Sequence, residues 1–338
     1  MLRHPADPYF PLLAGRLAWE ERDQNPMPWL QRALERSLVN GKAHILVATV
    51  VHATGSKSQA LLELRLAAEN DPTIAAQAAR LAVSWAKTLD ELISAAPTGP
   101  ARAASLDAMA SMMKDRSMGA QCDRLALETD ANRSGPHERL ANDVLETAKA
   151  EKCSDREACE REFEQHVAAI ERIDPQFSTG ARLRAQWLVH SGHADDALTR
   201  LGETCESFRD FDRCLEARVQ IAAGIDESQP LIKAAKAMLN SVCMDAERCA
   251  KTATWVGDLH MGRSEFGSAM TSFTRAVKEG ETIERLVKLA DAASRAGMHA
   301  QAIRALERAL VKSGGKAPKI EQTLAQERAA IGASLAEH

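Results

Sequence analysis

Apolar and polar positions along this chain recur with the period of amphipathic helices. In residues 41–74, Ala, Leu and Val recur three or four positions apart, and a turn at Gly55 interrupts the pattern once. This spacing places the apolar residues on one face of a helix. No run of alternating apolar and polar residues is bounded by turn residues, so we expect an all-α chain with almost no strand.

The helical pattern itself repeats along the chain with a period of about 34 residues. In the clearest copy, Ala48 lies in a first helix, Gly55 in a turn, and Ala60 and Ala67 in a second helix that ends before Pro72. Small residues let two antiparallel helices approach closely, and larger apolar residues fill the seam. The other copies have matching residues at Leu30 and Ala33; at Ala185, Leu188, Gly192, Ala197 and Leu201; at Gly257, Ala269, Phe273 and Ala276; and at Leu289, Ala290, Gly297, Ala302, Leu306 and Ala309.

These five segments resemble the tetratricopeptide repeat (TPR) family. The resemblance implies a TPR-like α-solenoid of antiparallel helix pairs, with degenerate pairs at about 75–120, 136–175 and 215–242. The segment after Pro318 is expected to form a C-terminal capping helix that covers the exposed end of the stack.

Two arrays are expected within the solenoid. The stretch from Ser117 to Pro136 is polar and has the weakest helical pattern in the chain. We therefore place an N-terminal array at residues 1–116 and a C-terminal array at residues 117–338.

Composition narrows the functional classes. The 43 Lys and Arg and 47 Asp and Glu residues give a net charge of −4 without an obvious charged block. The sequence therefore lacks the clustered basic residues that are typical of nucleic-acid-binding proteins. No stretch approaches the roughly 18 uncharged apolar residues of a membrane span, and the opening MLRHPADPYF lacks the apolar middle of a signal peptide. We expect a soluble chain that has no nucleic-acid partner and no membrane span.

Six of the seven cysteines form three close pairs, and each pair falls at an expected junction between helices. The pairs are Cys153 with Cys159, Cys205 with Cys214, and Cys243 with Cys249, which leaves Cys122 single. Local disulfides would clamp the chain to a helix end and would indicate an oxidising compartment, which for a bacterial-looking chain is the periplasm or the cell exterior. The alternative is a cytosolic protein with reduced, buried cysteines. Six cysteines allow 15 connectivities, so local pairing is a preference.

The sequence around the first and third pairs suggests how such bridges would sit. Ser154 is expected as an N-cap with Glu157 completing a capping box, and Asp245 as the cap beside the third pair. A zinc site using Cys159 and His166 is a further alternative, but no C-x2-C pair is present, and structural zinc usually has one.

No catalytic or cofactor motif occurs in the chain, so we expect neither enzyme activity nor a cofactor. His190 and His193 flank a turn glycine and are interpreted as solvent-facing residues, with no metal bound. The five tryptophans are interpreted mainly as core residues, since most lie at helical spacing among apolar neighbours: Trp19, Trp29, Trp85, Trp187 and Trp255.

The TPR resemblance implies a binding groove lined by the first helix of each pair. For each position, the alternative is ordinary solvated surface. The residues at those positions are Lys42, Thr49, His52, Arg182, Gln186, His190, Lys251, Asp258, Asp291 and Arg295. They mix both charge signs, so they do not reproduce the basic clamp that some TPR proteins use for a terminal carboxylate.

The function that we expect is a non-catalytic protein–protein interaction or scaffolding module in the bacterial envelope, with a protein or peptide partner. The opening HPADPYFPLLAGRLA, the following WLQRALER helix and SQALLELRLA resemble the soluble TPR-like region of O-antigen ligase-like membrane proteins. Catalysis in that family belongs to its membrane part, so the resemblance implies none here. A cytoplasmic TPR adaptor or regulator with reduced cysteines is the alternative, and an enzyme on a helical scaffold is a third.

Overall fold

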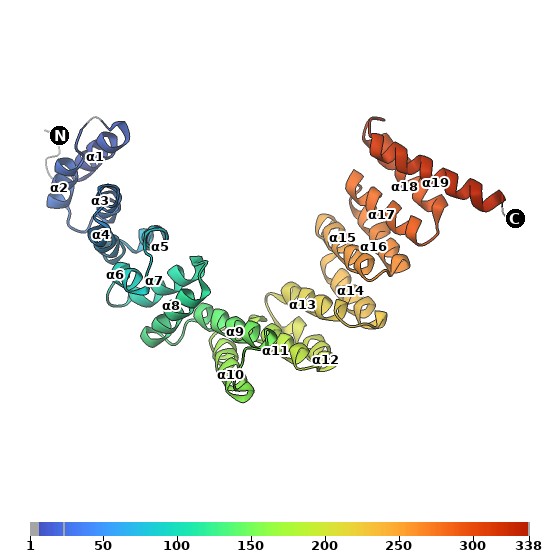
Figure 1. The fold of residues 1–338 in the computed structure, drawn as a ribbon, viewed down its shortest axis with the longest axis horizontal. Helices are drawn as coiled ribbons and strands as arrows, with labels where there is room; N and C mark the ends of the chain where they lie inside the picture. The colour runs from blue at the N-terminus through green and yellow to red at the C-terminus, as the bar shows by residue number, and fades with distance from the viewer. Residues whose placement is uncertain (1–6, 23, 337–338) are drawn as a thin grey trace. The chain divides into compact units, whose positions relative to one another are not determined.

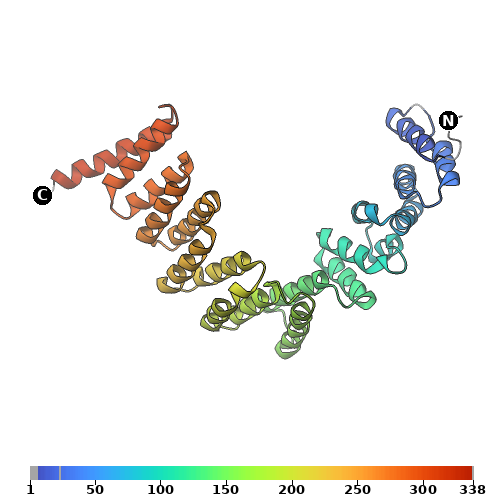
Figure 2. The ribbon, with the colours of Figure 1, turned by 180° about the vertical axis from the view of Figure 1, so that it is seen from behind.

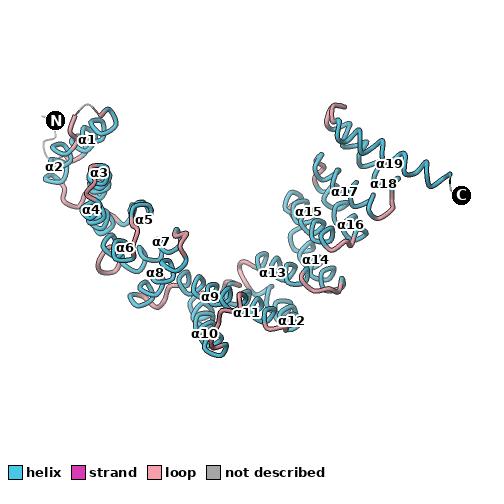
Figure 3. The backbone as a smooth tube through the Cα atoms, in the orientation of Figure 1, coloured by secondary structure: helices cyan, strands magenta, loops and turns pink. Residues whose placement is uncertain are grey.

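The computed structural model describes residues 7–22 and 24–336, with side chains described up to residue 330. All regular structure in that part of the chain is helical, without a strand (Figure 3), which confirms the all-α prediction. None of these helices combines the length and the apolarity that crossing a bilayer requires. The chain divides into two compact units between Pro175 and Gln176.

The first unit contains helices that follow one another in chain order, and chain neighbours pack together (Figure 1). Within the described residues they are α1 Tyr9–Glu21, α2 Met27–Arg36, α3 Gly41–Ala53, α4 Lys57–Asn70, the 3-10 turn η1 Pro72–Ile74, α5 Ala75–Trp85, α6 Leu89–Ala95, α7 Ala101–Met112, α8 Arg116–Thr129, α9 Ser134–Lys149 and α10 Arg156–Ile173. The closest packing is between α1 and α2, α3 and α4, α7 and α8, and α9 and α10. The region 75–100 departs from regular pairing, because the short α6 packs on α4 while α5 packs on α7.

Over residues 176–336, the second unit consists of four helix pairs and a terminal helix, which Figure 2 shows from behind. Its helices are α11 Thr179–His190, α12 Ala194–Thr204, the 3-10 turn η2 Cys205–Ser207, α13 Phe211–Ala223, α14 Ser228–Val242, α15 Ala246–Gly262, α16 Phe266–Glu279, α17 Ile283–Arg295, α18 His299–Lys312 and α19 Pro318–Ala336. The last helix packs on α18 and buries Leu324. This confirms the predicted capping helix.

The small residues of the repeat pattern form the seams between paired helices. Ala48, Ala60 and Ala67 are each 0% exposed. The equivalent alanines in the second unit are also buried: Ala185, Ala197, Ala269, Ala276, Ala290, Ala302 and Ala309. An alanine at the closest point lets two helices approach without a large side chain between them. The fold is therefore the TPR-like α-solenoid that the sequence predicts.

The predicted turn glycines lie between the helices of a pair. Gly55, Gly192 and Gly297 have φ angles of +94°, +85° and +73°. A glycine enters this region at little cost because it has no Cβ. In the turn between α15 and α16 the corresponding left-handed residue is Ser264, with φ +59°.

A buried ionic cluster joins three helices of the first unit. Arg139 of α9 donates to Asp123 of α8 at 2.6 Å and to Asp107 of α7 at 2.6 Å. The Asp123 side chain is 0% exposed, and burial raises its pKa although Arg139 and Arg116 act in the opposite direction. Removing one partner of such a cluster leaves a buried charge uncompensated, so the cluster fixes how α7, α8 and α9 pack.

The array division expected at residues 116 and 117 falls inside the first unit, at the start of α8. There, Leu106 and Met109 of α7 share one hydrophobic cluster with Cys122 and Ala126 of α8. The compact units divide at residues 175 and 176, after α10.

The tryptophans pack mainly against the core, as predicted. Trp187 is 7% exposed, and Trp19, Trp85 and Trp255 are half-buried against hydrophobic clusters. Trp29 is the exception, because it lies beneath the Arg32 guanidinium at 5.1 Å from the ring centroid.

Candidate functional site

The three cysteine pairs lie at disulfide distance in the arrangement expected from their spacing. The Cα atoms of Cys153 and Cys159 are 6.3 Å apart, those of Cys205 and Cys214 are 5.3 Å apart, and those of Cys243 and Cys249 are 4.4 Å apart. These separations are within or close to the usual range for a disulfide. Each pair joins the segment before a helix to that helix's first turn.

The cap beside the first pair differs from the prediction. The N-cap of α10 is Asp155, whose carboxylate accepts from Ala158 N at 3.1 Å, so the expected capping box of Ser154 and Glu157 is wrong. The helix begins one residue later than expected, and this register leaves Asp155 at the position that can reach the third helical N–H. The predicted cap Asp245 is confirmed, since its side chain accepts from Arg248 N at 3.0 Å.

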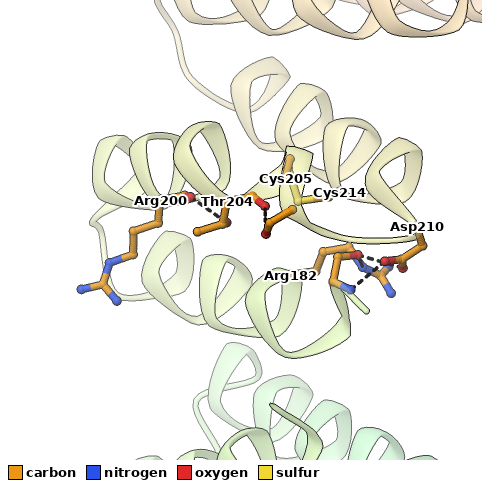
Figure 4. Close-up of a disulfide and its surroundings, with 8 residues drawn as sticks. Arg182, Arg200, Thr204, Cys205, Asp210 and Cys214 are labelled. Carbon is orange, nitrogen blue, oxygen red and sulfur yellow. Dashed lines mark hydrogen bonds between the residues drawn. A yellow bond between two sulfur atoms is a disulfide. The ribbon is translucent and has the colours of Figure 1, made fainter. Parts of the chain in front are cut away.

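The pair of Cys205 and Cys214 connects the end of α12 to the start of α13 (Figure 4). Both residues are at most 1% exposed. In the same loop, the Asp210 carboxylate accepts from the N–H and the hydroxyl of Ser178 at 2.7 and 2.9 Å. The loop is thus held at two points, on α13 by sulfur and on the start of α11 by Asp210.

Cys122 is the remaining cysteine and is fully buried in the first unit. Burial, together with the neighbouring Asp123, raises the pKa of its thiol to about 11. The thiolate is the reactive form of cysteine, so this residue is inert near neutral pH.

Cys159 and His166, the residues of the alternative zinc site, are each engaged with another residue. His166 Nδ1 lies 2.8 Å from His137 Nδ1, and Cys159 lies within disulfide distance of Cys153. Burial, His137 and Arg124 lower the pKa of His166 to about 4. Within the described residues, no three His, Cys, Asp or Glu side chains are grouped so that they could hold a metal ion.

The groove residues expected on α3 have different surroundings. Lys42 is exposed, while Thr49 donates its hydroxyl to the Ile45 carbonyl at 2.8 Å. His52 stacks on Trp85, with ring centroids 4.1 Å apart and planes 9° from parallel. The exposed Lys42 thus differs from Thr49 and His52, which are engaged within the unit.

The groove residues expected on α11 line one face of that helix. Arg182 donates to the Ser178 hydroxyl at 3.1 Å, Gln186 is half-buried, and His190 is exposed next to Trp187. The exposure of His190 agrees with its interpretation as a solvent-facing residue, as does that of His193.

The groove residues expected on α15 and α17 are exposed and ion-paired within the unit. Lys251 pairs with Glu247 along α15, Asp258 with Lys288 of α17 at 2.6 Å, and Asp291 with Arg295 along α17 at 3.0 Å. The pair of Asp258 and Lys288 shows that successive first helices are neighbours. The role of these residues in binding stays a prediction.

No protein-family model matches this sequence, and no curated protein matches it. Solved structures to which the chain is similar include a monomeric mutant of IFIT1 (13% identity, 79% of this chain and 68% of that chain, TM-score 0.35). Another is yeast Tom70, with 13% identity over 96% of this chain and 82% of that chain and a TM-score of 0.31. A third is the RpL4 assembly chaperone Acl4, with 12% identity over 98% of this chain and 99% of that chain and a TM-score of 0.25. Scores this low transfer no function to this chain, and none of the comparisons shows the O-antigen ligase-like resemblance.

Clefts open between successive second helices of the second unit, a face to which the sequence pattern did not point. One cleft, of about 640 Å³, lies between α12 and α14 above α13. Arg218 of α13 lies against Gly202, where a Cβ would be 2.8 Å from its guanidinium. The lining of this cleft carries both charge signs: Asp195, Glu203 and Glu227 with Arg218 and Lys233.

The next cleft, of about 350 Å³, lies between α14 and α16 above α15. Its lining combines apolar and hydroxyl side chains with Lys236 and Arg275, and includes no carboxylate. Within the described residues, neither cation forms a salt bridge. The lining residues are Ile232, Ala235, Lys236, Leu239, His260, Ser268, Thr271, Ser272 and Arg275.

A polar cluster joins the starts of the two helices that form this cleft. Glu265, just before α16, accepts from the Ser228 hydroxyl of α14 at 2.7 Å and from Arg263 Nε at 2.7 Å, and its other oxygen lies 2.6 Å from His260 Nδ1. Burial opposes ionisation of Glu265, but the hydrogen bonds from Ser228, His260 and Arg263 outweigh it and lower its pKa to about 2. Arg263 also donates to the Ala223 carbonyl at 2.8 Å.

A sequence signal for this cleft exists but is weak. Lys236 and Arg275 occupy surface positions of second helices, where a cation is ordinarily a solvated residue. Only their positions on neighbouring helices bring them to one cleft, and α14 belongs to a pair whose repeat pattern is degenerate.

Proposed function

We propose that this chain is a non-catalytic scaffold that binds a protein or peptide partner. The observation that carries the proposal is the succession of clefts between second helices in the second unit. Helix pairs that pack only on their chain neighbours leave such surfaces exposed, and repeat proteins use them for binding. A row of clefts suits an extended polypeptide better than a small molecule.

We further propose that the protein works in an oxidising compartment such as the bacterial periplasm. Three local cysteine pairs at disulfide distance support this, because such bonds persist outside the reducing cytoplasm. The more specific proposal, that the chain is the soluble part of an O-antigen ligase-like protein, rests on the sequence resemblance near the N-terminus.

An array of immobilised random peptides, probed with the folded and unreduced protein, tests the binding function. We expect a sequence-related subset of peptides to retain the protein. A helical protein of similar net charge and unrelated sequence is the control. If no peptide binds, or if the control protein selects the same subset, the proposed function is wrong.

A thiol count on unreduced protein from its native compartment tests the compartment separately. One thiol per denatured chain, with peptide mapping that links the three local pairs, is the expected result. Seven thiols in a folded helical protein would favour a cytoplasmic adaptor. The peptide-binding proposal would survive that outcome.

A further inference from the structure

We infer that the cleft between α14 and α16 binds a segment of a partner protein in which acidic residues alternate with apolar ones. The inference rests on the proposed binding function and gives it a site and a partner chemistry. Lys236 and Arg275 are the residues that would receive the carboxylates.

Charge complementarity is the first reason. The lining holds two cations and no carboxylate, whereas Lys251, Lys288 and Arg295 on the first helices of this unit are ion-paired. A partner carboxylate would therefore meet Lys236 and Arg275 without displacing an internal partner. Charge-assisted hydrogen bonds of this kind are stronger than neutral ones, and an arginine can bind a carboxylate through two parallel bonds.

The second reason is the arrangement of the apolar residues. Along α14, Ile232, Ala235 and Leu239 recur three or four positions apart and so face the cleft from one side of the helix. Ile232 is 39% exposed, although it is a large aliphatic residue. An apolar side chain of the partner can cover it while a neighbouring carboxylate reaches Lys236.

The third reason is that the cleft is already formed. The cluster of Ser228, His260, Arg263 and Glu265 ties the start of α14 to the start of α16 and to the end of α15. The helices that form both walls and the floor are thus joined at one end of the cleft. A preformed site avoids the entropy cost of ordering its walls on binding.

The site differs from the groove expected on the first helices. None of the ten residues predicted for that groove lines the cleft between α14 and α16. The inference therefore moves the partner to the opposite helix of each pair and makes the two surfaces separable by mutation.

Fluorescence anisotropy with a labelled eight-residue peptide of alternating Leu and Glu tests the inference on the full chain. The same peptide with Gln in place of Glu is the comparison. We expect the Glu peptide to bind in a salt-dependent way, and Lys236→Ala with Arg275→Ala to weaken it roughly tenfold to a hundredfold, because two charge-assisted contacts are lost.

Lys278→Ala with Lys316→Ala is the matched control, since it removes two exposed cations that lie outside both the cleft and the groove predicted on the first helices. Circular dichroism establishes that both double variants keep their helices. In addition, Lys236→Glu with Arg275→Glu is expected to abolish binding of the Glu peptide and to permit binding of a Leu and Lys peptide.

Three results would overturn the inference while leaving the proposed function intact. They are equal binding of the Gln and Glu peptides, equal losses in the two double-alanine variants, and a peptide-array subset without acidic residues. Preferential binding of inorganic phosphate or of a 12-nucleotide single-stranded RNA at the same cations would also overturn it, because the occupant would then be a different anion.

Discussion

At the scale of single residues, glycine sets how closely α15 and α16 approach. Gly257 is buried in α15, and a Cβ there would lie 2.5 Å from a ring carbon of Phe273, which is 1% exposed. The phenyl ring therefore occupies the space that any larger residue would need. The repeat pattern places a small residue here, and the packing shows why alanine is already too large.

Gly257→Ala is expected to lower the free energy of unfolding by about 1–3 kcal/mol, because overpacking outweighs the gain in helix propensity. Urea denaturation measures the change. Gly267→Ala in α16 is the control, since nothing lies within 4 Å of its Cβ position. An equal or stabilising effect of both substitutions would show that Phe273 can move aside freely.

Glu265 is the residue whose ionisation matters most for the cleft. Its pKa is lowered from 4.5 to about 2, so the stabilisation is fully present above pH 4.5 and is lost as the pH falls toward 2. The corresponding contribution at neutral pH is on the order of 3 kcal/mol. Acid should therefore loosen the link between α14 and α16 within that window.

Glu265→Gln is expected to destabilise the protein at pH 7 and to flatten the dependence of stability on pH between 4.5 and 2. Denaturant unfolding across that range measures both effects. The exposed Glu284→Gln is the control and should change neither. If the wild type and Glu265→Gln lose stability in parallel below pH 4.5, another carboxylate governs the acid response.

At the scale of elements, the cysteine pairs act where a helix begins. The pair of Cys205 and Cys214 is buried, whereas Cys153 and Cys159 are half-buried. The pair of Cys205 and Cys214 also lies in the loop in which Asp210 contacts the start of α11, so this loop positions both α11 and α13. Losing this pair should therefore affect packing as well as chain entropy.

Cys205→Ala with Cys214→Ala is expected to lower stability by about 2–3 kcal/mol or more, because ring closure and buried contacts are both lost. Amide hydrogen exchange should speed up at the start of α13. Cys153→Ala with Cys159→Ala is the comparison and should cost less. If the order is reversed, the bridge at α10 is the more important one for the fold.

At the scale of the whole molecule, the chain is two units, each with its own core. The boundary after α10 lies between two helix pairs and leaves both pairs whole. A cut between residues 116 and 117 would separate α7 from α8, which form one pair. That cut would expose Leu106 and Met109 on one fragment and Ala126 on the other.

Fragments 1–175 and 176–338 are expected to be helical and to unfold cooperatively when expressed separately. Fragments 1–116 and 117–338 should aggregate or lose helix, because the seam between α7 and α8 is opened. Circular dichroism and thermal melting measure this. Comparable folding of both sets of fragments would mean that the cores of single helix pairs suffice.

The sequence by itself determined the helices, the seams and the turns of this protein. The pattern of small residues can be recognised from the sequence because it is local. Ala48 and Ala60 in the seam and Gly55 in the turn occupy fixed positions within one helix pair. The local cysteine pairing was only a preference among 15 connectivities at the level of the sequence, and the structure places each pair at disulfide distance across a helix start. The predicted N-cap Ser154 was wrong by one residue, because Ser154 and the adjacent Asp155 are both residue types that cap helices and the sequence does not choose between them.

Only the tertiary structure decided the unit boundary and the candidate cleft. The boundary depends on which helices share a core, and the degenerate pairs carry no pattern that reveals it. The cleft depends on Lys236 and Arg275, which lie on different helices and come together only when α14 and α16 both pack on α15. Periodicity fixes which face of a helix is buried, but the distance between surface residues of two helices is set by packing alone.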